Sequence, residues 1–86
     1  MHKIDLSTKA EAVYRRLFER DRFLFDRMRA ALGAIAEEPL EGNPLKGSLR
    51  GARSWRVGQY RIIYRVEDKR LVVLILDMGH RGDIYR

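Results

Sequence analysis

Cysteine is absent from this 86-residue chain, which excludes disulfides, a thiol nucleophile and thiolate metal ligands. The two histidines, His2 and His80, form no spaced ligand cluster, so we expect no metal site. There is no apolar run long enough to span a bilayer, and no secretory signal pattern opens the chain. These absences indicate a cytoplasmic protein whose chemistry, if it has any, is metal-free.

Negative charge is also scarce relative to positive charge. Lys and Arg total 18 against 12 Asp and Glu, a net charge of +6 on a chain long enough for only one core. Such a field attracts polyanions, with nucleic acid favoured over an anionic membrane surface or a merely solubilising charge. We therefore expect a single basic domain, residues 1–86, with an acidic partner.

The N-terminal half has helical periodicity after a short opening strand around residues 4–6. Thr8 and Glu11 fit a capping box, which predicts a first helix over about residues 9–20. Asp21 can cap a second helix, and Pro39 ends it. Two helices with so short a break should form a hairpin whose apolar stripes face one flat surface.

The C-terminal half changes to period two. Residues 39–54 are rich in Gly, Pro and basic side chains and predict a loop, and a short strand should include Trp55 and Val57. Residues 60–66 alternate as a second strand, and the apolar run 71–76 predicts a central strand covered on both faces. The expected class is α+β, with the helical hairpin on one face of a small, mostly antiparallel sheet.

Arginines are expected on the sheet face opposite the helices, where Arg56, Arg61 and Arg81 could converge. One arginine on a strand is usually a solvated charge, but three in one concavity repel unless an anion joins them. The planar guanidinium suits a phosphodiester because it bonds two oxygens at once. Tyr85 adds an aromatic face for a base, or simply closes the core. His80 has an acid–base pKa near neutrality, yet in a strand it faces away from Arg81.

Three segments together resemble the RelE branch of the RelE/ParE toxin superfamily. They are the Pro-Leu-Lys-Gly loop at 44–47, the stretch from Trp55 to Tyr64, and the Gly-His-Arg-Gly-Asp-Ile-Tyr ending at 79–85. The resemblance spans nearly the whole chain and implies a RelE-like microbial ribonuclease fold. It also implies a toxin that cleaves messenger RNA in the ribosomal A site, by attack of the ribose 2′-hydroxyl on the adjacent phosphate, without a metal or cofactor.

By this resemblance, Arg61 corresponds to a phosphate-stabilising arginine, and Arg81 to one that stabilises the transition state or leaving group. Tyr85 corresponds to a tyrosine that stacks on the substrate and takes part in proton transfer. Arg56 occupies a position where some members have a catalytic lysine, and Lys46 matches a basic RNA contact.

One departure from the family pattern leaves the general base open. Ser54 stands where better-studied members have a second lysine, so the base is missing or replaced by Arg53, Arg56 or Tyr85. Arginine hardly ever loses its proton, so the proton acceptor should be Tyr85, His80 or water. Arg53 and His80 are otherwise expected to contact RNA.

Two other functions compete with the ribonuclease. A ParE-like DNA gyrase inhibitor would share the fold, but usually lacks the Asp-Ile-Tyr ending found at 83–85. A catalytically inert RNA- or ribosome-binding module would use the arginines only to grip phosphate. In each toxin reading, an acidic, amphipathic antitoxin is the expected protein partner.

The C-terminal assignments give a first testable prediction. Arg81→Ala or Tyr85→Phe should lower ribosome-dependent cleavage by roughly tenfold to a thousandfold, the range for loss of one transition-state or proton-transfer group. Cleavage is measured on translating ribosomes, with circular dichroism confirming the fold. If both variants cleave like the parent, the assignment of these two residues is wrong.

Overall fold

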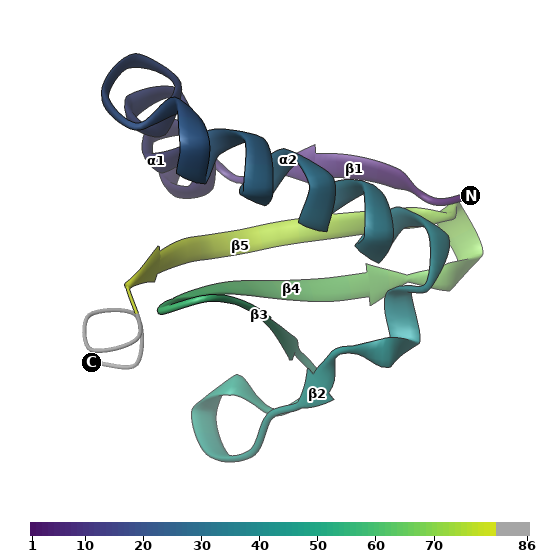
Figure 1. The fold of residues 1–86 in the computed structure, drawn as a ribbon. Helices are drawn as coiled ribbons and strands as arrows, with labels where there is room; N and C mark the ends of the chain where they lie inside the picture. Colours follow the sequence, from purple (N-terminus) through teal and green to yellow (C-terminus); the bar gives the residue numbers. More distant parts are fainter. Residues whose placement is uncertain (81–86) are drawn as a thin grey trace.

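One mixed five-stranded sheet organises the computed structural model, which describes residues 1–80 (Figure 1). In chain order the elements are β1 (Lys3–Leu6), α1 (Thr8–Arg20), α2 (Arg22–Glu37), η1 (Pro39–Glu41), β2 (Asn43–Pro44), η2 (Gly47–Leu49), β3 (Arg53–Val57), β4 (Tyr60–Glu67), η3 (Asp68–Arg70) and β5 (Val72–His80). The strand order is β1-β5-β4-β3-β2, with β1 parallel to β5 and the other pairs antiparallel. The predicted α+β class and mostly antiparallel sheet are confirmed.

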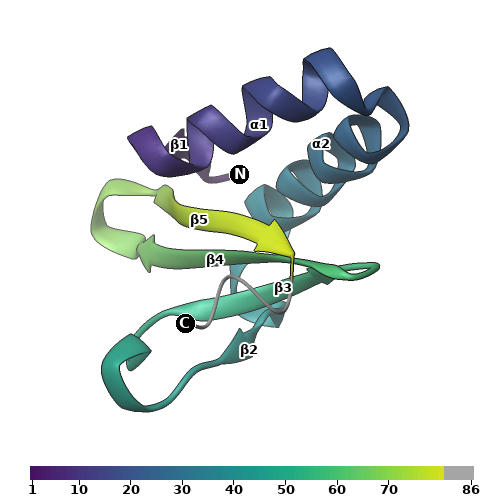
Figure 2. The same ribbon diagram turned by 90° about the vertical axis from the view of Figure 1, so that its left-hand side faces the viewer.

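Both helices cover the same face of the sheet, as Figure 2 shows. Leu17 of α1 and Met28 and Ile35 of α2 enter one core with Ile62 and Tyr64 of β4. The predicted helical hairpin is therefore confirmed, and its apolar stripes face the sheet as their spacing required. Within residues 1–80, neither helix is long and apolar enough to cross a membrane.

The first helix begins one residue earlier than its sequence pattern indicated. Ser7, and not Thr8, is the N-cap: its hydroxyl accepts a hydrogen bond from the Ala10 N–H at 3.0 Å. The Ser7 hydroxyl also donates to the Leu76 carbonyl at 2.8 Å, a contact that sequence spacing does not reveal. The predicted cap of α2 is confirmed, because Asp21 Oδ1 accepts from the Leu24 N–H at 3.1 Å.

Two expectations for the C-terminal half need correction. Residues 39–54 were expected to be a loop, but they contain η1, η2 and the two-residue edge strand β2, which pairs with Arg53 and Ser54. The apolar run was expected to start a strand at Leu71, which instead is an exposed turn residue with a φ of 54°. The preceding η3 turn needs a left-handed residue there to reverse the chain into β5, and this overrides the apolar pattern.

Strand β5 is buried more completely on one face than on the other. Val73 and Ile75 face the helices and are fully buried, whereas Leu74 and Leu76 are only half-buried. The expected cover on both faces is thus incomplete over the described residues, because both helices lie on the same side. The opposite face is the one that carries the candidate site.

The Tyr64 hydroxyl fastens the segment after α2 to the centre of the sheet. This buried side chain accepts a hydrogen bond from the Gly42 N–H at 3.0 Å and donates one to the Pro39 carbonyl at 2.7 Å. Burial raises the pKa of Tyr64, with the Gly42 N–H opposing the shift, so the donating proton is retained. Gly42 must lack a side chain, because a Cβ there would overlap the tyrosine hydroxyl.

Removing this hydroxyl should destabilise the protein. Tyr64→Phe leaves two buried backbone groups unpaired and should lower the free energy of unfolding by about 1–3 kcal/mol in urea denaturation. Tyr14→Phe is the matched control, since the half-buried Tyr14 hydroxyl has no hydrogen-bond partner among residues 1–80. Equal losses in both variants would contradict an anchoring role for Tyr64.

Candidate functional site

Two arginines face each other across β3 and β4. Arg56 and Arg61 are register partners, on the face opposite the one that Trp55 and Ile62 turn toward the helices. Like charges directly opposite in a sheet are destabilising. Within the described chain neither arginine has an ion-pair partner, so the pair forms a concentration of positive charge on the open face.

Arg61 carries the most unusual polar atom among the described residues. Its Nη1 is buried and has no hydrogen-bond partner within residues 1–80, while Arg56 Nε reaches only its own turn, at 3.4 Å from the Gly58 carbonyl. A buried N–H without an acceptor costs free energy, more so on a charged group. An oxyanion placed beside Arg61 would supply the missing acceptor.

On the other side of Arg61, the described part of β5 adds no side chain beside the guanidinium. Arg61 pairs with Gly79 of β5, which has no side chain, and a Cβ built at Gly79 would meet no described atom within 4 Å. The nearest carboxylate on β5, Asp77, is held by Lys9 at 3.1 Å and does not neutralise Arg61. Within residues 1–80, therefore, no carboxylate is paired with the Arg61 guanidinium.

Ser54 occupies the next row of this face. It is buried, opposite Ile63 of β4 and Asn43 of β2, and it lines a shallow depression of about 270 Å³ together with Arg56. A serine hydroxyl has no basic pKa near neutrality, so this position supplies no general base. Beside the Arg56–Arg61 pair, the described chain thus places a hydroxyl at Ser54 and not a general base.

Arg53 does not join this pair. It is the register partner of Tyr64 and so belongs to the helix-side face, where its Nη1 donates to the carbonyls of Leu40 at 3.1 Å and Gly42 at 2.9 Å. These bonds fasten the β2 approach to β3. The period of two along β3 explains the separation, since Arg53 and Arg56 are three residues apart and fall on opposite faces.

Lys46 and His80 are also apart from the arginine pair. Lys46 is exposed at the start of η2, beyond the end of β3 that is opposite to Arg56. His80 ends β5 opposite Tyr60, with ring centroids 5.9 Å apart, on the helix-side face. Arg81 and Tyr85 lie outside the described residues.

Arg65 is a candidate that the sequence interpretation did not single out as functional. It shares the open face of β4 with Arg61. Its guanidinium lies against Gly51, at the end of the η2 loop, where a Cβ added to Gly51 would be 2.9 Å from Arg65 Nη1. This places a guanidinium between Arg61 and the Lys46 loop. The alternation of residues 60–66 contained the signal, because residues two and four positions apart share a face.

A helical hairpin packed on a five-stranded sheet is an arrangement that this chain shares with known toxins. A family model described as the ParE toxin of type II toxin–antitoxin systems matches residues 4–85. The chain is 47% identical over 57 residues to toxin RelG of Mycobacterium tuberculosis, a match that covers 65% of this chain and 66% of that toxin. The chain therefore belongs to the RelE/ParE family of type II toxins.

Solved structures agree with this assignment. The RelBE2 toxin–antitoxin complex of M. tuberculosis contains a chain with 35% identity and a TM-score of 0.79, over 95% of this chain and 93% of that one. The isolated RelE toxin of E. coli shares the fold, with a TM-score of 0.79 at 23% identity over 99% of this chain and 92% of that one. The resemblance to RelE-type toxins and their fold is thus confirmed.

Within residues 1–80, Arg61 Nη1 has no hydrogen-bond partner, whereas Arg53 Nη1 has two. Replacing these two arginines should therefore change the stability in opposite directions. Arg61→Met removes a buried donor that lacks an acceptor, and should raise the free energy of unfolding by about 1 kcal/mol. Arg53→Met is the matched control, and should lower it by about 1–2 kcal/mol because two backbone carbonyls lose their donor. Urea denaturation of both variants provides the measurement. A larger loss for Arg61→Met than for Arg53→Met would show that Arg61 stabilises the fold.

Proposed function

We propose that this toxin is a ribosome-dependent endoribonuclease, which cleaves messenger RNA in the A site by attack of a ribose 2′-hydroxyl on the adjacent phosphate. The observation that carries the proposal is the buried Nη1 of Arg61, which has no hydrogen-bond partner within residues 1–80. In the cleavage step the attacking oxygen adds to phosphorus, and the phosphate oxygens gain negative charge. A guanidinium already positioned and desolvated stabilises that charge without reorganising.

Arg56 and Arg61 act together on the scissile group. Their opposed positions across β3 and β4 let two planar forks approach the non-bridging oxygens of one phosphate. An anion between the two guanidinium groups reduces their mutual repulsion. The attraction is therefore strongest in the transition state, where the phosphate oxygens gain negative charge. Arg65 and Lys46 extend the positive surface along which flanking phosphates run.

The proton of the 2′-hydroxyl needs an acceptor other than these arginines. His80 lies with Tyr60 on the helix-side face, which argues against it as the base at a phosphate held by Arg61. Tyr85 and water therefore remain the candidates, with Arg81 stabilising the leaving 5′-oxygen. No step in this scheme calls for a metal or a cofactor.

An antitoxin is the protein partner that we propose. The related RelBE2 structure is a toxin–antitoxin complex, and so is the structure of intact RelBE from E. coli. The net charge of +6 favours an acidic partner, and Phe18 and Phe23 at the helical corner are exposed. Free of that partner, the toxin would act in the cytoplasm, where messenger RNA is translated.

The central test is loss of cleavage on removing Arg61. Arg61→Ala should lower ribosome-dependent cleavage by roughly a hundredfold to a thousandfold, as for removal of one donor to a developing oxyanion, and Arg61→Lys should restore part of it. Arg70→Ala is the control, since Arg70 pairs with Glu67 in η3 at the far end of β4. Cleavage by Arg61→Ala equal to that by Arg70→Ala would refute the assignment.

Gyrase inhibition is the second candidate, because the matching family model takes its name from ParE. Mapping messenger ends on translating ribosomes after induction, with gyrase-linked DNA breaks scored in the same cells, separates the two. Cuts within A-site codons without DNA breaks support the ribonuclease. DNA breaks without messenger cuts support the gyrase inhibitor, and ribosome binding with neither supports an inert module.

A further inference from the structure

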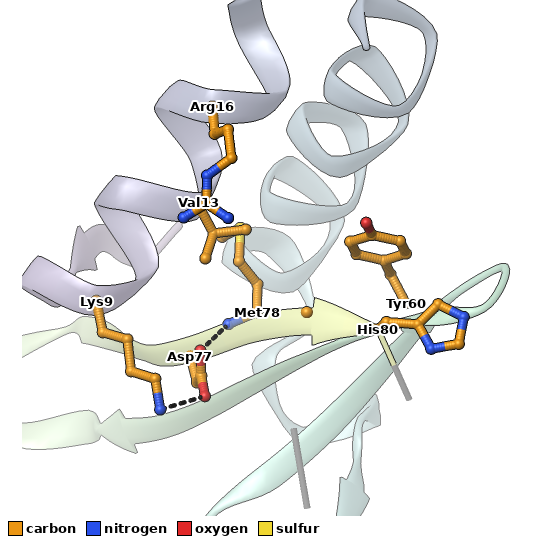
Figure 3. Close-up of a pocket in the computed structure, with 8 residues that line it drawn as sticks. Lys9, Val13, Arg16, Tyr60, Asp77, Met78 and His80 are labelled. Carbon is orange, nitrogen blue, oxygen red and sulfur yellow. Dashed lines mark hydrogen bonds and ion pairs between the residues drawn. The ribbon is translucent and has the colours of Figure 1, made fainter. Parts of the chain in front are cut away.

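A second basic site lies on the helix side of the sheet. A pocket of about 270 Å³ opens between α1 and the C-terminal end of β5 (Figure 3). Lys9 and Arg16 border it from α1, and Tyr60 and His80 border it from the sheet, with Met78 between them. Neither Arg56 nor Arg61 lines this pocket.

The charges around this pocket are not balanced. Lys9 is neutralised by Asp77, at 3.1 Å, and Asp77 is itself held by the Met78 N–H, which donates to its Oδ1 at 2.8 Å. Arg16 is exposed, and Figure 3 shows its side chain reaching from α1 toward Val13 and Met78. Within residues 1–80 it has no ion-pair or hydrogen-bond partner, so one guanidinium fork is available to an anion.

This pocket is close to the arginine pair, although the sheet separates them. The Tyr60–His80 register pair is adjacent to the Arg61–Gly79 pair in the β4–β5 ladder. On the outer side of β5, pairing with β1 ends at Ile75, so within the described chain no strand covers residues 76–80. Along this edge of the described chain, a flexible polyanion can pass beside residues 76–80 of β5 from one face to the other.

We propose that the pocket is a second phosphate subsite, in which Arg16 holds an RNA phosphate that flanks the scissile one. This inference rests on the proposed ribonuclease function and extends its substrate contacts to the helix side. The half-buried Tyr60 ring offers an adjoining base a stacking surface, which favours a nucleotide over an acidic peptide. The guanidinium of Arg16 is suited to bind two oxygens of one phosphate.

Binding of a non-cleavable RNA tests the subsite separately from catalysis. The probe is a fluorescent oligonucleotide with 2′-O-methyl riboses, which lack the nucleophile, titrated with the whole chain at several salt concentrations. Arg16→Ala should weaken binding by about tenfold and reduce the slope of log K against log salt by about 0.7, the value for one single-strand phosphate contact. Arg16→Lys should keep the slope and lose part of the affinity.

Arg20→Ala is the matched control, because Arg20 is an exposed arginine of α1 that does not border the pocket. Its affinity and salt slope should equal those of the parent. If Arg16→Ala also equals the parent while Arg61→Ala weakens binding, the subsite is wrong and the proposed function stands. If the parent itself does not bind the oligonucleotide, the subsite is also wrong, whereas the proposed function is decided separately by cleavage on translating ribosomes.

Two further probes identify the source of the anion. Inorganic phosphate should perturb the amide NMR signals of residues 16 and 80 only at concentrations far above those needed with the oligonucleotide. Equal affinity for both would overturn the RNA assignment in favour of free phosphate. A poly-glutamate peptide that depends on Arg16 while RNA binding does not would overturn it in favour of an acidic protein.

Discussion

The arrangement of this molecule depends on β4 being paired on both sides while its side chains alternate between two faces. Ile62 and Tyr64 point into the helical core, and Arg61 and Arg65 point to the open face. A slip of one residue would bury the arginines and expose the core side chains. The register that protects the core is therefore the same register that presents the cations, and fold and site cannot vary independently.

The open face contains polar groups that cost the fold stability. Arg56 opposes Arg61, and a buried guanidinium nitrogen has no partner within the described chain. Gly79 leaves space beside them instead of supplying a carboxylate. On the helix side, by contrast, the polar groups of Arg53 and Tyr64 are hydrogen-bonded to the backbone. The polar groups on the helix side thus hold neighbouring segments together, whereas Arg61 Nη1 on the open face has no partner within residues 1–80.

Much of the fold could be predicted because its signals are local. Helical spacing, the Asp21 cap and the alternation of residues 60–66 each arise within a few residues, and each is confirmed. The predictions were wrong where contacts between residues far apart in the chain determine the local structure. Ser7 became the helix cap, with its hydroxyl also bonded to β5, and Leu71 took a left-handed conformation because the chain must reverse there. No pattern along the chain contains those constraints.

The sequence by itself determined the family, the two helices, the alternating strands and the number of arginines in them, because periodicity and residue type act locally. Tertiary structure decided which basic residues share a surface. It brought Arg56 against Arg61, turned Arg53 inward to backbone carbonyls, and set His80 beside Tyr60 on the other face. The physical reason is that strand register and sheet order fix faces and neighbours, and both depend on pairing between residues far apart in the chain.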